Sequence, residues 1–213
     1  MPTSHSGQIN EIVELITTAN PMSVLDIGVG FGKYGFLSRE YLELSDGRNE
    51  YNKWQRRIDG IEGYADYIGE LQKLIYTNVY IGNILDVLPK SEIKYDLILM
   101  IDVFEHFTYE EGIKILGFCL RHGKNIIIST PKLMSEQGDA FENPLETHKF
   151  QWQKKHFDNY ANKFYVKNLY SHIYFIGEDA LSVKKRISIN RSKLWIVIKF
   201  PFVFHLYQWI KKR

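Results

Sequence analysis

The sequence predicts an α/β protein with a doubly wound, mostly parallel seven-stranded sheet that ends in antiparallel C-terminal strands. Short apolar runs alternate with helix-like segments along most of the chain. The run YDLILMID at 95–102 is almost wholly apolar, which is typical of a central parallel strand. In the run VLDIGVGFGKYG at 24–35, a strand leads into a glycine-rich loop and then into a helix, as in nucleotide-cofactor folds.

The elements follow in order along the chain. Apolar side chains at helical spacing predict a helix over 7–19, followed by a first strand at 23–27. We expect further strands and helices in alternation: a helix to about residue 41, a strand at 57–62, a helix at 65–74, strands at 78–82 and 95–102, a helix at 108–121 and a strand at 125–130. The irregular stretch 43–57 reads as an insertion, and β-rich runs at 163–170, 172–177 and 180–187 read as antiparallel strands.

Length and composition indicate one globular domain over residues 1–187 and a separate C-terminal segment over 188–213. The single cysteine, Cys119, excludes an internal disulfide, is typical of a reducing compartment and is expected to pack in a helix. Near the N-terminus, Glu11 and Glu14 interrupt any apolar run of a signal peptide. We therefore predict a cytoplasmic location.

The charge is unevenly distributed. All 25 acidic residues lie at or before Asp179, whereas nine of the 27 basic residues follow it, so the net charge is −7 before residue 180 and +9 after it. The segment 188–213 is also rich in aromatic residues. It reads either as packing on the core or on a partner subunit, as in a homodimer, or as peripheral membrane contact. A spanning helix is disfavoured because Lys199 and Pro201 interrupt a short apolar stretch.

The acid in the glycine-rich run indicates which cofactor the loop binds. Gly30, Gly32 and Gly35 have the Gly-x-Gly-x-x-Gly spacing of dinucleotide folds, but Asp26 would then face a pyrophosphate and repel it. A cofactor with a sulfonium and an ammonium is instead attracted by a carboxylate. The alternative, a glycine-rich turn without a ligand, does not account for the strand–loop–helix context.

This run resembles motif I of the class I S-adenosylmethionine-dependent methyltransferases, acid-x-Gly-x-Gly-x-Gly, which Asp26, Gly28, Gly30 and Gly32 match. The resemblance covers about residues 20–180 and implies a Rossmann-like methyltransferase fold that binds S-adenosyl-L-methionine. It places Glu62, at the end of the second strand, on the ribose hydroxyls. It also places Asn83 and Ile84, after the third strand, on the adenine; the family often has Asp where this chain has Asn83, and Asp86 is a substitute candidate.

The motif DVFEHF follows the fourth strand. The resemblance implies that Asp102 faces the methionine end of the cofactor, and one helical turn would bring Asp102, Glu105 and His106 together. In ubiquinone-pathway O-methyltransferases and small-RNA 2′-O-methyltransferases this pattern binds a divalent cation, aided in the latter by a later histidine, for which His148 is the candidate here. The other readings are a metal-free base or substrate contact at His106 and His148, or a structural role. We assign the two histidines as catalytic and assign no metal.

The segment 132–160 is long, polar and aromatic, and in the resembling family this region carries substrate-binding residues. Phe150, Trp152 and His156 would shape the acceptor pocket or only pack the loop down.

The sequence thus predicts methyl transfer to a hydroxyl or amine of a small-molecule, sugar or lipid-linked acceptor. Two alternatives stay open: a cofactor-binding but catalytically silent partner subunit, and an RNA 2′-O-methyltransferase. The acidic body argues against a nucleic-acid partner, because phosphate backbones attract basic faces.

Overall fold

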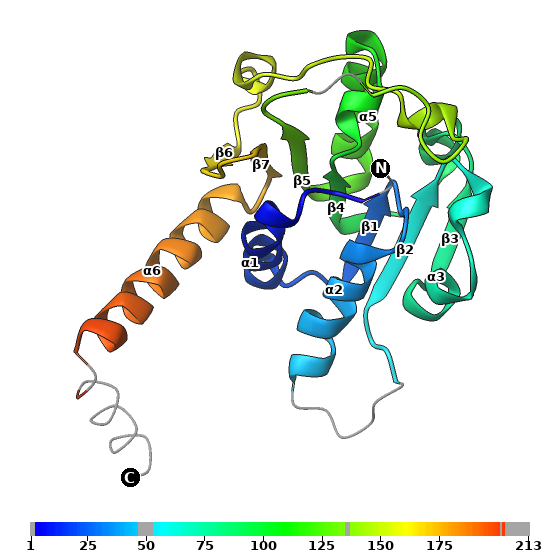
Figure 1. Cartoon of the computed structure of the whole chain (residues 1–213). Helices are drawn as coiled ribbons and strands as arrows, with labels where there is room; N and C mark the ends of the chain where they lie inside the picture. Colours follow the sequence, from blue (N-terminus) through cyan, green and yellow to red (C-terminus); the bar gives the residue numbers. More distant parts are fainter. Residues whose placement is uncertain (1–2, 47–52, 135–136, 201, 203–213) are drawn as a thin grey trace.

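The computed structural model describes residues 3–46, 53–134, 137–200 and 202, and these fold around one twisted sheet (Figure 1). Its strands are β1 Ser23–Ile27, β2 Arg57–Glu62, β3 Asn78–Ile81, β4 Tyr95–Ile101, β5 Gly123–Pro131, β6 Lys163–Val166 and β7 Ser171–Gly177. They lie in the order β3-β2-β1-β4-β5-β7-β6. The first five pair in parallel, and β7 runs antiparallel to both β5 and β6.

This order confirms the predicted seven-stranded, doubly wound sheet with antiparallel strands at its C-terminal end. From β1 the chain first builds outward through β2 and β3, and then returns to the other side of β1 with β4 and β5. The order reverses between β1 and β4, and in open α/β sheets a ligand crevice forms beyond the carboxyl ends of the strands at such a point.

Helices cover both faces of the sheet (Figure 1). They are α1 Ile9–Ala19, α2 Lys33–Leu42, α3 Glu70–Ile75, α4 Ile84–Val87, α5 Tyr109–His122 and α6 Ala180–Lys199. Residues of α1, α2 and α6 pack into one apolar cluster, whereas residues of α4 and α5 pack into a second cluster on the opposite face. The predicted packing role of Cys119 is confirmed, because its side chain is buried in this second cluster.

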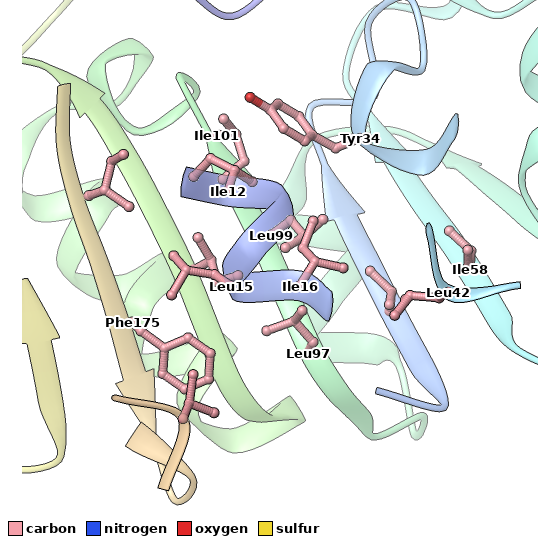
Figure 2. Close-up of a cluster of buried hydrophobic side chains, with 14 of the residues drawn as sticks. Ile12, Leu15, Ile16, Tyr34, Leu42, Ile58, Leu97, Leu99, Ile101 and Phe175 are labelled. Atoms are coloured by element: carbon pink, nitrogen blue, oxygen red, sulfur yellow. The ribbon is translucent and has the colours of Figure 1, made fainter. Parts of the chain in front are cut away.

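The central strands are apolar throughout because both of their faces are covered. In β4, Leu97 and Leu99 belong to the first cluster, and the alternating Ile98 and Met100 belong to the second. Figure 2 shows the first cluster, in which Ile12, Leu15 and Ile16 of α1 lie over Leu97 and Leu99. The apolar spacing that predicts the 7–19 helix is therefore the face that α1 buries.

The strand predicted at 180–187 is wrong, because these residues form the first two turns of α6. Ala180, Val183 and Ile187 are its buried side chains, and their spacing follows one helical stripe. The β-branched residues of this run favour a strand locally, but packing on the first cluster decides in favour of a helix. The predicted boundary between 187 and 188 falls within this continuous helix.

Smaller differences concern the 65–74 helix and the tail. The predicted helix is divided into a 3-10 turn, Ala65–Tyr67, and α3, with Gly69 between them. Part of the predicted insertion, 47–52, and most of the predicted C-terminal segment, 203–213, lie outside the described residues. None of the described helices combines the length and hydropathy that crossing a bilayer requires.

Truncation of Val183 tests whether α6 belongs to the core. Because Val183 is fully buried, Val183→Ala should lower the free energy of unfolding by about 2 kcal/mol through lost burial and a residual cavity. Leu181, two residues away on the same helix and 72% exposed, provides the matched control, and Leu181→Ala should change stability by less than about 0.5 kcal/mol. Urea denaturation measures both, and equal effects would contradict this docking of α6.

Candidate functional site

A cleft opens at the carboxyl ends of β1, β2 and β4, where the strand order reverses. It is lined by most of the predicted site residues: Asp26, Gly28, Gly30, Glu62, Asn83, Ile84, Asp102 and His106. Gly32 and His148 are not among the lining residues. Several further lining residues were not predicted, and they come from the N-terminal segment, α2, the turn after β2 and the loop after β5: Ser4, Lys33, Tyr34, Tyr67, Leu145 and Lys149.

The loop between β1 and α2 takes a conformation that requires glycine. Gly28, Gly30 and Gly32 have φ angles of 78°, 50° and 88°, in the left-handed region that L-residues rarely adopt. A Cβ on Gly28 would also lie 2.4 Å from Cγ2 of Val103, so a side chain there would clash. Gly32 precedes the first residue of α2, and its role is to begin that helix.

Glu62 anchors this loop from the neighbouring strand. One oxygen of its carboxylate accepts a hydrogen bond from the Gly30 backbone N–H at 2.8 Å, and the other accepts from the Tyr64 N–H at 2.9 Å. The side chain is buried, and burial raises the pKa of Glu62 although the backbone hydrogen bonds oppose the shift. Each oxygen has a second lone pair, so the carboxylate is able to accept ligand hydroxyls as well.

Asp26, at the end of β1, is a second buried acid beneath the loop. Its carboxyl accepts a 2.5 Å hydrogen bond from the Tyr76 hydroxyl. Burial raises the pKa of Asp26 to about 7, while the Tyr76 hydrogen bond lowers it. At neutral pH the carboxyl is therefore close to half ionised, and a cationic ligand in the cleft would favour its charged form.

Asp102 ties the N-terminal segment to the end of β4. Its Oδ2 accepts from Gln8 Nε2 at 2.6 Å and from the His5 N–H at 3.0 Å, and its Oδ1 accepts from Ser129 Oγ at 2.8 Å. Asp102 also has a positive φ of 53°. Three donors on one carboxylate hold this backbone conformation at the cleft wall.

Lys33 joins the same segment from α2. Its ammonium donates to the Ser4 carbonyl at 2.6 Å and to Ser4 Oγ at 3.1 Å. Burial lowers the pKa of Lys33, while the nearby Asp102 raises it. Residues 3–8 are thus fastened across the cleft at two points.

The side chain of Asn83, which was predicted to contact adenine, caps a helix in this structure. The Asn83 side-chain oxygen accepts from the Leu85 N–H at 2.9 Å and so caps the N-terminus of α4. Asn83 and Ile84 still line the cleft, and Ile84 is buried. The substitute candidate Asp86 is exposed and is not among the lining residues.

Glu105, His106 and His148 lie together next to the cleft. One potential ligand atom from each lies within 4.8 Å of the others, and the two imidazole ring centres are 5.0 Å apart. Phe104–His106 forms a 3-10 turn rather than the predicted α-helical turn, and Asp102 is not part of this group. Within the described residues, the candidate metal set is thus one carboxyl and two imidazoles.

Burial sets the protonation of this group. Glu105 is 3% exposed, its Oε2 has no hydrogen-bond partner within the described residues, and burial raises its pKa well above the usual range. Burial likewise lowers the pKa of His106, whose Nδ1 lies 3.3 Å from the Thr147 carbonyl. A neutral imidazole can accept a proton from a substrate or bind a divalent cation, so the group fits either chemistry.

The loop after β5 is held against the 3-10 turn by hydrogen bonds to backbone carbonyls of that turn. The Lys149 and Phe150 N–H groups donate to the Glu105 carbonyl at 2.9 and 3.2 Å, and Trp152 Nε1 donates to the Phe104 carbonyl at 2.8 Å. Trp152 is 1% exposed and packs in the second apolar cluster. Of the two readings for Phe150, Trp152 and His156, packing is favoured, since none of them lines the cleft.

Comparisons with solved structures show the fold. An O-methyltransferase family protein from Burkholderia thailandensis superposes with a TM-score of 0.57 at 12% identity, over 79% of this chain and 56% of that one. PigF with S-adenosylhomocysteine gives 0.56 at 16% identity, over 81% and 55%. The N-terminal domain of EvdMO1 in the presence of S-adenosylhomocysteine and D-fucose gives 0.54 at 12% identity, over 82% and 84%.

This chain spans little more than half the length of the first two of these proteins. No protein-family model matches the sequence, and no curated protein matches it. The chain has the Rossmann-like fold of class I methyltransferases, which confirms the predicted fold class.

Asp26→Asn should remove a pH-dependent loss of stability. The folded carboxyl has a pKa of about 7, whereas the ordinary pKa of an aspartate is 3.8, so the folded state retains a proton that the unfolded state releases between these values. The contribution of Asp26 to the free energy of unfolding therefore falls as the pH rises from about 4 to about 7, by about 4 kcal/mol.

Urea denaturation of wild type and variant at about pH 5 and about pH 8 measures this difference. Asp86→Asn removes an exposed acid and should follow the wild-type profile. Parallel profiles for wild type and Asp26→Asn would contradict the assigned protonation of Asp26.

Proposed function

We propose that this chain is a methyltransferase that uses S-adenosyl-L-methionine to methylate a hydroxyl or amine of a small-molecule, sugar or lipid-linked acceptor. The observation that carries the proposal is the pair of buried carboxyls, Asp26 and Glu62, on either side of the left-handed glycine loop. A dinucleotide would bring its pyrophosphate against these acids, whereas a cofactor with a sulfonium and an ammonium gains from them.

The residues of the cleft fit that cofactor. Glu62 accepts the ribose hydroxyls through the lone pairs that its backbone contacts leave open. Ile84 offers its apolar side chain and a backbone N–H at the first position of α4, where helices leave such groups without intrahelical partners. Asn83 lies beside it at the cleft wall. Asp26 and Asp102, at the ends of β1 and β4, face the cationic methionine part.

The cofactor supplies a methyl group that its sulfonium already activates, so the protein mainly aligns the acceptor and excludes water. We assign removal of the acceptor proton to His106, which lines the cleft, and the tilted ring of His148 lies beside it. Burial lowers the pKa of His106, so its imidazole is neutral and free to take a proton near neutral pH. Leu145 and Lys149 from the loop after β5 border the acceptor side.

The proposal also includes the class of the acceptor and the cellular location of the protein. The net charge of −7 before residue 180 disfavours RNA, and a similar structure determined in the presence of D-fucose supports a sugar among the acceptors. The single, buried Cys119 supports a cytoplasmic setting. Homodimer formation stays a prediction.

A divalent cation is a second candidate for the role of the histidines, and the grouping of Glu105, His106 and His148 favours it. The cation would then favour the ionised form of Glu105, whereas burial raises the pKa of this carboxyl and opposes ionisation. Such an ion would orient an acceptor hydroxyl and lower its pKa.

Calorimetry with S-adenosylhomocysteine tests the cofactor assignment. Glu62→Ala removes both the anchor of the loop and the acceptor for ligand hydroxyls, and Gly30→Val places a side chain in the left-handed loop. Each variant should raise the dissociation constant at least about 10-fold. Asp86→Asn, an acid close by but outside the cleft lining, should bind like wild type. Unchanged affinity in both Glu62→Ala and Gly30→Val would refute the site.

Labelled S-adenosyl-L-methionine mixed with extracts of small molecules and lipids tests catalysis. The wild type should transfer the labelled methyl group to an acceptor in these extracts. His106→Ala should abolish this transfer but still bind S-adenosylhomocysteine, and this outcome supports an enzyme. Binding without transfer to any fraction supports the catalytically silent subunit.

Mn²⁺ titration followed by electron paramagnetic resonance separates a base from a metal site. If the histidines act as a metal-free base, we expect no saturable Mn²⁺ site in the wild-type protein, and EDTA should leave transfer intact. The opposite result would be a saturable Mn²⁺ site that His148→Ala removes, together with methyl transfer that EDTA abolishes and Mg²⁺ restores. It would show that the histidines bind a cation and do not act as a metal-free base.

A further inference from the structure

The helix α6 leaves the body of the protein after its first half. Ala180, Val183 and Ile187 are buried in the first apolar cluster, and the Arg191 guanidinium pairs with Glu14 of α1. Beyond that ion pair the helix continues past the sheet, as the orange to red part of Figure 1 shows. Two helical turns therefore extend past its last ion pair with the body.

This extended end is apolar on all sides. Leu194, Trp195, Ile196, Val197 and Ile198 are consecutive, and steps of about 100° per residue distribute five such side chains around the whole helix. Leu194, Trp195 and Ile198 are 59–69% exposed. Large exposed apolar patches mark binding surfaces, because their exposure to water is costly.

The remaining surface of α6 is strongly basic. From Ala180 to Lys199 the helix carries no acidic residue and six basic ones: Lys184, Lys185, Arg186, Arg191, Lys193 and Lys199. Apart from Arg191, none of these six has an ion pair within the described residues. The surface that meets α6 must therefore offer negative charge next to an apolar interior.

An anionic lipid surface meets these requirements better than a protein partner. A partner that packs on one helix face requires an apolar stripe and leaves the other side polar. A turn that is apolar all round, with a tryptophan and flanking lysines, instead suits insertion into the interface between headgroups and acyl chains. In sequence, residues 200–210 continue with aromatic and apolar residues before Lys211, Lys212 and Arg213.

We propose that the distal end of α6 docks this protein on an anionic membrane surface, with Leu194–Ile198 entering the interface and the basic residues contacting acidic headgroups. This inference goes beyond the proposed methyl transfer and does not depend on it.

Co-sedimentation of the full chain with vesicles tests this docking. Vesicles of phosphatidylcholine with added phosphatidylglycerol should bind the protein, vesicles of phosphatidylcholine alone should bind it much less, and added salt should release it. The combined variant Lys184→Gln, Lys185→Gln and Arg186→Gln should lower partitioning to the anionic vesicles by about 100-fold.

A second combined variant, Leu194→Ser, Trp195→Ser and Ile198→Ser, should also abolish binding at either lipid composition. The matched control is Leu74→Ser, Leu169→Ser and Leu181→Ser, which removes three side chains that are at least as exposed but lie outside the distal end of α6, and it should leave binding unchanged. Circular dichroism checks that each variant is folded. Calorimetry with S-adenosylhomocysteine reports separately on the cleft, so failure of the methyltransferase assignment would be distinguishable from failure of the docking.

Three results would overturn the proposal. One is the absence of binding to anionic vesicles by the wild-type chain. Another is equal binding by the wild type and the variant at Leu194, Trp195 and Ile198. The third is a dimer, seen by sedimentation velocity without vesicles, that this variant abolishes, because the occupant of the distal end of α6 would then be a second copy.

Discussion

The site depends on one contact, the hydrogen bond from the Gly30 N–H to the buried carboxylate of Glu62. It joins the loop after β1 to the end of β2, and it holds a left-handed backbone that has no strand or helix to define it. A buried carboxylate is costly unless donors satisfy it, and here the Gly30 and Tyr64 amides do so. The loop and the acid therefore stabilise each other, and together they define the floor of the cleft.

Three buried acids lie in or beside this cleft. Burial raises the pKa of Asp26, Glu62 and Glu105, so all three carboxyls lie in an environment that resists negative charge. A cation nearby reverses that effect and favours ionisation. A cationic ligand in the cleft would therefore shift the buried acids toward their charged forms.

The histidine side of the cleft is assembled by long-range contacts. Backbone amides of Lys149 and Phe150 bind the Glu105 carbonyl, and the Trp152 indole binds the Phe104 carbonyl. These bonds bring His148 beside His106, although 42 positions separate them in the sequence. Gly112 permits the close approach of Trp152, because a Cβ there would lie 2.2 Å from the indole.

The sequence by itself determined the sheet and the glycine-loop end of the cleft, because both depend on local patterns. Apolar runs identify strands that are buried on two faces, and glycines beside Asp26 and Glu62 identify a strand–loop–helix cradle. Only the tertiary structure decided that 180–187 is helical, that Asp102 binds Gln8 rather than joining Glu105, and that Trp152 packs inside. Each of these outcomes depends on contacts between distant segments, whose free energy outweighs the local preferences that a sequence displays.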